Sequence, residues 1–265
     1  MDEKGKLYVV GIGPGDFKNM TFWAMNAIEE SEVIIGYETY IDLLRENIPD
    51  KIKNKEIFET GMTEEIDRAH FAIEKARGGK IVSIVSSGDA GIYGMAALVY
   101  EALLESDWKP GDNPDVEVIP GITAASACAA LIGSPLSLDF AVISMSDLLV
   151  PWEVIEKRIR SAAEGDFVIV IYNPKSKKRT WQIERARDII LEYRSPDTPV
   201  ALIKSAFREG QKVKITTLGE LGDDSILGML TTVIIGNSTT FVKNSIMLTP
   251  RGYSSKYEVK FSGRK

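Results

Sequence analysis

Short apolar runs alternate with amphipathic stretches in the first half of the chain, and this alternation limits what the chain can fold into. The apolar runs occupy residues 7–12, 33–36, 81–85 and 116–119, with helical periodicity between them. Continuous runs of Val, Ile and Leu predict strands that are buried on both faces, and strands that alternate with helices predict a mostly parallel sheet. We therefore expect an α/β fold.

The pattern changes near residue 136, where we place a boundary between two α/β lobes, 1–136 and 137–265. The later strands are predicted at 140–143, 167–172, 199–204, 212–217 and 232–236. Helices are predicted at 152–164 and 179–193. The turn around residues 208–210 is short, which predicts an antiparallel hairpin and makes the second sheet mixed.

The composition narrows the class of protein. Of the 265 residues, 44% are hydrophobic and 26% are charged, which is ordinary for a globular protein. One cysteine cannot form an internal disulfide, and no apolar run approaches the ~18 residues of a membrane span. A net charge of −6 argues against nucleic acid, and a single histidine with a single cysteine leaves no Cys/His zinc site. We expect a cytoplasmic protein with no membrane or nucleic-acid partner and no protein-bound metal.

The first predicted strand ends in a glycine-rich turn, GIGPGD at residues 11–16. A strand, such a turn and a helix can together indicate dinucleotide binding, but the spacing departs from G-x-G-x-x-G. Pro14 lacks the N–H that a pyrophosphate would use, and the carboxylate of Asp16 would repel it. The turn is then either a tight structural link or the lining of a cleft that holds no phosphate. An NAD-dependent oxidoreductase, with Glu38 on the ribose, is the alternative.

Two further turns follow predicted buried strands: SSGDAGIYG at 86–94 and PGITAA at 120–125. Ligands of open α/β sheets bind at the carboxyl ends of strands, and glycine lets a backbone approach a ligand closely. Asp89 is an acceptor suited to ribose hydroxyls or amino groups, although Asp89 and Thr123 could also be plain helix caps. Three glycine-rich strand ends in one lobe favour a single ligand site over three unrelated turns.

The sequence at these three turns resembles the tetrapyrrole methylases, with GIGPGD at 11–16, SGDAGIYG at 87–94 and IPGITA at 119–124. That family uses S-adenosylmethionine in a cleft between two α/β lobes, and the resemblance covers nearly the whole chain. Four later segments resemble one branch of it, the precorrin-3B (cobalt-factor III) carbon-17 methyltransferases of corrin-ring synthesis. They are DLLVPWE at 147–153, YNPKSKKR at 172–179, IGNSTTF at 235–241 and MLTPRGY at 247–253.

The resemblance implies which residues contact the cofactor. They are Pro14, Gly88, Asp89, Ile92, Thr123 and Ala124 in the first lobe, and Asn173, Ala206, Gly236 and Asn237 in the second. No catalytic residue follows from the sequence, and Ser87 and Asp89 are the candidates. Methyl transfer from a sulfonium needs neither a metal nor a covalent nucleophile, because positioning and the exclusion of water supply most of the catalysis.

The resemblance further implies a polycarboxylate tetrapyrrole substrate, methylation at carbon 17 with contraction of the macrocycle, and a homodimer. Such a substrate needs cationic donors, and the residues that follow a predicted strand include Lys175, Lys177, Lys178 and Arg179. The same run could equally be a solvated basic loop. The alternatives to this function are another precorrin methyltransferase, an NAD-dependent oxidoreductase and a metabolite-binding module without catalysis.

Overall fold

The computed structural model of the chain describes residues 4–61, 64–222 and 224–253. Its internal contacts divide the chain into two compact units, Met1–Ala124 and Ala125–Lys265. This division lies earlier in the chain than the boundary predicted near residue 136. The reason is that the helix beginning at Ala124 packs its buried face against the second sheet.

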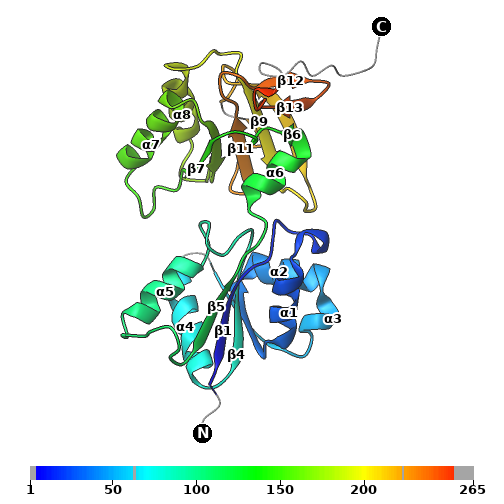
Figure 1. Ribbon diagram of the computed structural model, residues 1–265, viewed down its shortest axis with the longest axis vertical. Helices are drawn as coiled ribbons and strands as arrows, with labels where there is room; N and C mark the ends of the chain where they lie inside the picture. Colours follow the sequence, from blue (N-terminus) through cyan, green and yellow to red (C-terminus); the bar gives the residue numbers. More distant parts are fainter. Residues whose placement is uncertain (1–3, 62–63, 223, 254–265) are drawn as a thin grey trace. The chain divides into compact units, whose positions relative to one another are not determined.

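The first unit is built around a five-stranded sheet in which every neighbouring pair is parallel. The strand order is β3-β2-β4-β1-β5, of which β4, β1 and β5 are labelled in Figure 1. The strands are β1 (Lys6–Gly11), β2 (Val33–Tyr37), β3 (Glu56–Thr60), β4 (Ile81–Ser86) and β5 (Asp115–Ile119). The predicted parallel sheet is confirmed, and β3 is a strand that the prediction missed. Because parallel strands point the same way, the loops that follow all five strands emerge at one edge.

Helices cover both faces of this sheet (Figure 1). Along β1, Leu7 and Val9 lie in the core under α4 and α5, whereas Tyr8 and Val10 lie in the core under α1 to α3. This two-sided burial explains why the strands are continuously apolar. The helices are the 3-10 turn η1 (Phe17–Asn19), α1 (Phe22–Glu30), α2 (Glu38–Asn47), α3 (Pro49–Ile52), α4 (Glu65–Arg77) and α5 (Ala96–Leu104).

The second unit holds a mixed five-stranded sheet of order β10-β9-β11-β8-β7. Strands β7 and β8 are parallel, β11 is antiparallel to both of its neighbours, and β10 forms the predicted antiparallel hairpin with β9. The strands are β7 (Phe140–Ser144), β8 (Val168–Tyr172), β9 (Pro199–Lys204), β10 (Lys212–Thr217) and β11 (Thr231–Ile235). The prediction missed a small separate sheet of β6 (Gly133–Ser134), β12 (Phe241–Lys243) and β13 (Ile246–Leu248).

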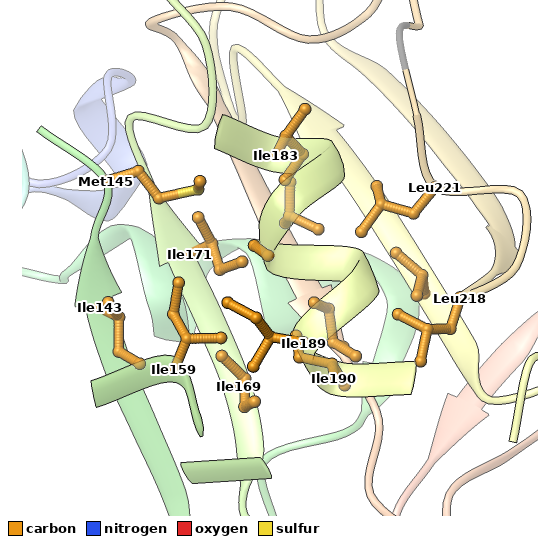
Figure 2. Close-up of a cluster of buried hydrophobic side chains, with 14 of the residues drawn as sticks. Ile143, Met145, Ile159, Ile169, Ile171, Ile183, Ile189, Ile190, Leu218 and Leu221 are labelled. Atoms are coloured by element: carbon orange, nitrogen blue, oxygen red, sulfur yellow. The ribbon is translucent and has the colours of Figure 1, made fainter. Parts of the chain in front are cut away.

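Both faces of the second sheet are also covered. On one face, Ile169 of β8 lies in a core with Ile159 of α7 and Ile189 of α8 (Figure 2). On the other face, Val170 of β8 lies in a core with Cys128 of α6. The helices are α6 (Ala124–Ile132), α7 (Trp152–Glu164) and α8 (Gln182–Leu191).

The direction of β11 decides which loops of the second unit share an edge. Thr231 at the start of β11 pairs with Lys204 at the end of β9, and Ile235 at the end of β11 pairs with Val200 near the start of β9. The loops after β8 and β9 therefore lie at the edge where β11 begins. The segment that follows β11 lies at the opposite edge.

Candidate functional site

Three glycine-rich loops of the first unit meet at the edge where its strands end, and we call them the glycine loops. They are residues 11–16, 86–95 and 120–124. The backbones of Gly13 and Gly88 exchange two N–H···O hydrogen bonds of 3.0 and 2.7 Å. A Cβ on Gly121 would lie 2.1 Å from the Gly88 oxygen and 2.6 Å from the Gly11 oxygen. Glycine is required here because three backbones approach one another too closely for any side chain.

Asp89 joins two of the glycine loops through its half-buried carboxylate. Its Oδ1 accepts from the backbone N–H of Gly91 at 2.8 Å, and its Oδ2 accepts from that of Gly121 at 2.9 Å. A carboxylate has about four lone-pair sites, so each oxygen can still accept from a ligand hydroxyl or amino group. Asp89 therefore shapes the loops and is also able to bind.

The loop after β4 combines a strained backbone with exposed side chains. Ser86 Oγ accepts from the N–H of Met95 at 3.1 Å and closes the loop. Tyr93 has a φ of 55°, in the left-handed region that a bulky residue rarely adopts, and the adjacent Ile92 is 41% exposed. Strain of this kind gathers at binding sites, where the surrounding structure must hold it.

The cofactor contacts that we predicted in the second and third glycine loops lie beside one another. A Cβ on Gly88 would be 3.7 Å from Thr123 Cα and 3.8 Å from the Ala124 nitrogen. Thr123 and Ala124 are half-buried, as is Ser87 at the start of the second loop. The structure thus brings these predicted contacts together at one place.

The first glycine loop is tightly held and carries a negative charge. Pro14 is buried, and Asp16 Oδ1 accepts from the N–H of Asn19 at 3.0 Å, which caps η1. The three glycine loops contain no basic residue, and their charged side chains are the two carboxylates of Asp16 and Asp89. The field that these loops produce therefore disfavours phosphate and favours a cationic ligand.

In the second unit, Asn173 follows β8 and is held from two sides. Its backbone is left-handed, with a φ of 53°, a conformation that Asn tolerates better than most residues. Its Nδ2 donates to Ser144 Oγ at 3.1 Å, and its carbonyl accepts from Arg179 Nη2 at 2.9 Å. Neighbouring loops therefore hold both the side-chain amide and the backbone carbonyl of Asn173.

Ala206 follows β9 and lies between two further left-handed residues. Ser205 has a φ of 52° and Phe207 a φ of 56°. The N–H of Ser205 donates to the Leu230 carbonyl at 2.9 Å, which brings the segment before β11 to this edge. Sequence reasoning missed that segment, residues 228–230, because no local pattern shows that β11 begins beside the end of β9.

Gly236 and Asn237 occupy a different place from the one that we predicted. They follow β11, which is antiparallel to its neighbours, so they lie at the opposite edge from the loops after β8 and β9. Arg194 Nη1 donates to the Gly236 carbonyl at 2.6 Å, and the buried Asn237 accepts hydrogen bonds from the turn that follows it. Both residues serve internal contacts at that edge.

The basic run after β8 divides into exposed and buried side chains. Lys177 and Lys178 are exposed, and Lys175 is half-buried. Arg179 is only 6% exposed, and its Nη1 lies 3.4 Å from Asp147 Oδ1. The structure therefore does not present the Arg179 guanidinium to a substrate carboxylate as predicted, because an internal ion pair already engages it.

A hollow of about 600 Å³ lies elsewhere in the first unit, lined by residues at the amino ends of β2 and β3. Two ion pairs form part of its lining. Lys51 lies 2.7 Å from Glu29, and Lys80 lies 2.6 Å from Glu32. We assign this hollow no ligand.

Two findings concern metals and membranes. Across residues 4–61, 64–222 and 224–253, no group of three or more His, Cys, Asp or Glu side chains could hold a metal ion. Over the same part of the chain, no helix has the length and apolar character needed to span a bilayer. The single histidine, His70, is exposed on α4.

Comparison with known proteins identifies the family. A family model described as tetrapyrrole (corrin/porphyrin) methylases matches residues 6–222, which include all three glycine loops and the loops after β8 and β9. The chain belongs to the tetrapyrrole methylase family.

Two relatives are similar over almost the whole chain. A protein named cobalt-factor III methyltransferase, from Priestia megaterium, is 53% identical over 254 residues, which are 96% of this chain and 46% of that relative. A protein named probable cobalt-factor III C(17)-methyltransferase, from Salmonella typhimurium, is 46% identical over 94% of this chain and 99% of that relative. The chain thus spans about half the length of the first relative and nearly all of the second.

Solved structures share the fold. The crystal structure of the methyltransferase CobJ matches with a TM-score of 0.85 at 34% identity, over 93% of this chain and 100% of that one. The uroporphyrin-III C-methyl transferase from Thermus thermophilus, complexed with S-adenyl homocysteine, matches with a TM-score of 0.65 at 21% identity, over 88% of this chain and 92% of that one. The second likeness concerns the fold alone. The predicted fold class is confirmed.

Proposed function

We propose that this chain is an S-adenosylmethionine-dependent C-methyltransferase of corrin-ring biosynthesis. Its reaction is methylation of carbon 17 of precorrin-3B or cobalt-factor III, with contraction of the macrocycle. A relative of almost the same length, 46% identical, is named probable cobalt-factor III C(17)-methyltransferase. The structural observation that carries the proposal is the meeting of three glycine loops around Asp89 at the carboxyl edge of a parallel sheet.

The glycine loops fit S-adenosylmethionine better than a phosphate-bearing cofactor. S-adenosylmethionine carries a cationic sulfonium and no phosphate, whereas NAD and ATP carry several negative charges. The loops present the carboxylates of Asp16 and Asp89, and Pro14 has no N–H to donate to a phosphate. This chemistry disfavours the alternative of an NAD-dependent oxidoreductase.

When bound, the cofactor would supply an electrophilic methyl group on a sulfonium, which an electron-rich ring carbon can attack in line while the sulfur leaves as the neutral thioether of S-adenosylhomocysteine. The residues of this chain act by binding and orientation. We assign the cofactor to the backbone of Gly88 and Thr123, with Asp89 accepting from the ribose or amino groups, and with further contacts from Asn173 and Ala206. Holding nucleophile and methyl about 3–3.5 Å apart in line is worth several kcal/mol of the barrier, and it requires neither a metal nor a covalent intermediate.

The exposed pair Lys177 and Lys178 is the proposed contact for the substrate carboxylates. The whole chain has a net charge of −6, so a polycarboxylate needs a local cationic surface to approach it. These two side chains are exposed beside the Asn173 turn. Lys175 is a further member of this proposed surface.

The experiment has a binding arm and a reaction arm. A thermal-shift screen should show stabilisation by S-adenosylhomocysteine and none by NAD or ATP, because a ligand of the native site stabilises it by mass action. Anaerobic incubation with S-adenosylmethionine and either cobalt-factor III or metal-free precorrin-3B should yield a tetrapyrrole that carries one additional methyl group, together with S-adenosylhomocysteine. Lack of product from both substrates contradicts the proposal, and methylation at another carbon favours another precorrin methyltransferase.

Two further parts of the proposal come from the sequence and the resemblance. We propose a homodimer and a cytoplasmic protein without membrane or nucleic-acid partners. Light scattering on the purified chain tests the first, since it measures mass in solution directly. Fractionation of cells that express the full chain tests the second.

A further inference from the structure

A buried ionic cluster ties together the loops at the edge of the second sheet where β8 and β9 end. Its centre is Arg179, which is 6% exposed and lies between β8 and α8. Arg179 Nη1 lies 3.4 Å from Asp147 Oδ1 in the loop after β7, and Nη2 donates to the Asn173 carbonyl at 2.9 Å. Nη2 also lies 3.8 Å from the sulfur of Met229, in the segment before β11. One guanidinium thus contacts three loops.

The cluster continues into α8 through Gln182. This side chain is 3% exposed, and its Nε2 donates to Asp147 Oδ2 at 3.2 Å. Asp147 therefore receives one donor from Arg179 and one from Gln182. The Asp147 side chain is 36% exposed, so this carboxylate also meets solvent.

Stability alone does not account for this arrangement. Arg179 Nε and Gln182 Oε1 are buried, and neither has a hydrogen-bond partner within the part of the chain that the structure describes. A buried polar atom left unpaired lowers stability, and a buried ion pair often contributes no more than an apolar contact of the same size. The cluster instead provides orientation, because the planar guanidinium fork holds the Asp147 carboxylate and the Asn173 carbonyl at once.

What the fork fixes is the turn at Asn173. The backbone of that residue is left-handed, and the residue precedes a proline, a combination that steric repulsion disfavours. The segment that follows this turn is closed by the N–H of Ser176, which donates to the Arg179 carbonyl at 2.9 Å, and by the N–H of Arg179, which donates to Ser176 Oγ at 3.1 Å. Arg179 thus holds the Asn173 carbonyl with its side chain and closes the next segment with its backbone.

We propose that Arg179 is a positioning residue for methyl transfer, which holds Asn173 in the orientation that contacts the cofactor and does not itself bind substrate. The inference rests on the proposed function, and within it on Asn173 as a cofactor contact. The exposed Lys177 and Lys178, two residues and one residue before Arg179, keep the proposed substrate role. Substitution of Arg179 should therefore weaken cofactor binding, whereas substitution of Lys177 and Lys178 should weaken substrate binding.

Three variants test this division. Arg179→Gln removes the charged fork, and Arg179→Lys keeps a charge near Asp147 but lacks the planar fork that places separate nitrogens at Asp147 and at the Asn173 carbonyl. Arg185→Gln is the matched control, because Arg185 is an exposed arginine of α8 that pairs with Glu156. Calorimetry should show S-adenosylhomocysteine binding about tenfold weaker in Arg179→Gln, with Arg179→Lys between it and wild type and the control unchanged.

Kinetics and salt dependence separate positioning from the other roles. In Arg179→Gln, the KM for S-adenosylmethionine should rise more than kcat falls, and tetrapyrrole binding should keep the salt slope of wild type. Hydrogen exchange of residues 144–151 and 173–181 should become faster while α8 stays protected. A weaker salt slope would instead place Arg179 on the substrate, and this result overturns the inference.

The remaining outcomes are also decisive. Folded Arg179→Gln protein with wild-type affinity for S-adenosylhomocysteine overturns the inference and leaves the proposed function intact. If Arg179→Gln does not fold, Arg179→Lys decides, and wild-type affinity in that variant overturns the inference. Failure of the wild-type chain itself to bind S-adenosylhomocysteine refutes the proposed function, and the inference with it.

Discussion

Replacing Gly121 by alanine tests whether the close approach of the glycine loops is what holds the first unit together at its binding edge. The new Cβ would lie 2.1 Å from the Gly88 oxygen, whereas ordinary van der Waals contact begins at 3.4 Å. The atoms that it meets are backbone, and Gly88 is fixed by its two hydrogen bonds to Gly13, so no side-chain rotation relieves the overlap. Overpacking of this kind costs typically 1–3 kcal/mol, and we expect about 3 kcal/mol here because backbone must move.

Gly228→Ala is the matched control, because a Cβ there meets nothing within 4 Å and its backbone is not left-handed. Its free energy of unfolding should stay within about 0.5 kcal/mol of wild type. Urea denaturation followed by circular dichroism measures both variants, and hydrogen exchange of β4 reports on the first unit separately. S-adenosylhomocysteine should also bind more weakly to Gly121→Ala, since the Asp89 contact to residue 121 is displaced. Equal stability of the two variants would refute the argument that three backbones are locked together.

Three further predictions concern single sites. Asp89→Ala should weaken S-adenosylhomocysteine binding by roughly 1–3 kcal/mol, because the carboxylate is the proposed ligand contact and also holds two backbone N–H groups; unchanged affinity in calorimetry would remove Asp89 from the proposed site. Lys177→Ala with Lys178→Ala should lower the salt slope of tetrapyrrole binding, and an identical slope would move the substrate contacts elsewhere. Burial raises the pKa of the Cys128 thiol from 9.0 to about 11. The stability that the buried neutral thiol contributes is therefore fully present below pH 9.0 and is lost as the pH rises through 11. Wild type should therefore lose roughly 1.5–2 kcal/mol relative to Cys128→Ala between about pH 8.5 and pH 10.5 in urea titrations, and a constant difference would contradict the burial argument.

The meeting of the glycine loops at one edge of the first unit could be predicted from the sequence because each loop directly follows its own strand. Parallel strands bring all such loops to one edge, so the local patterns at 11–16, 86–94 and 120–125 were sufficient to group them. The sequence could not show that the Asp89 carboxylate joins two of the glycine loops. Its two backbone donors, Gly91 and Gly121, lie 2 and 32 residues away, and only the folded loops bring the second one within reach.

The edge of the second unit could not be read in the same way. An apolar run such as residues 231–235 looks the same whichever way its strand points, and the direction of β11 exchanges the segments before and after it between the two edges. For that reason the prediction chose Gly236 and Asn237, whereas the structure brings residues 228–230 beside Ala206. The basic run misled us for a related reason, since charge patterning does not show that Arg179 alone turns inward toward a carboxylate 32 residues earlier in the chain.

Two buried arginines show why residue type alone cannot separate a structural contact from a positioning one. Arg194 donates to the Gly236 carbonyl at the edge where β11 ends, and burial lowers its pKa while the nearby Asp166 carboxylate acts in the opposite direction. Arg179 donates to the Asn173 carbonyl at the other edge. Both guanidinium groups satisfy loop carbonyls that no strand pairs, which is a general requirement of buried backbone. What differs is the place, because one carbonyl belongs to the edge shared by the loops after β8 and β9 and the other lies at the far end of the same sheet. The antiparallel direction of β11 therefore separates two chemically similar contacts, and only the contact to Asn173 lies at the edge where we propose that the cofactor binds.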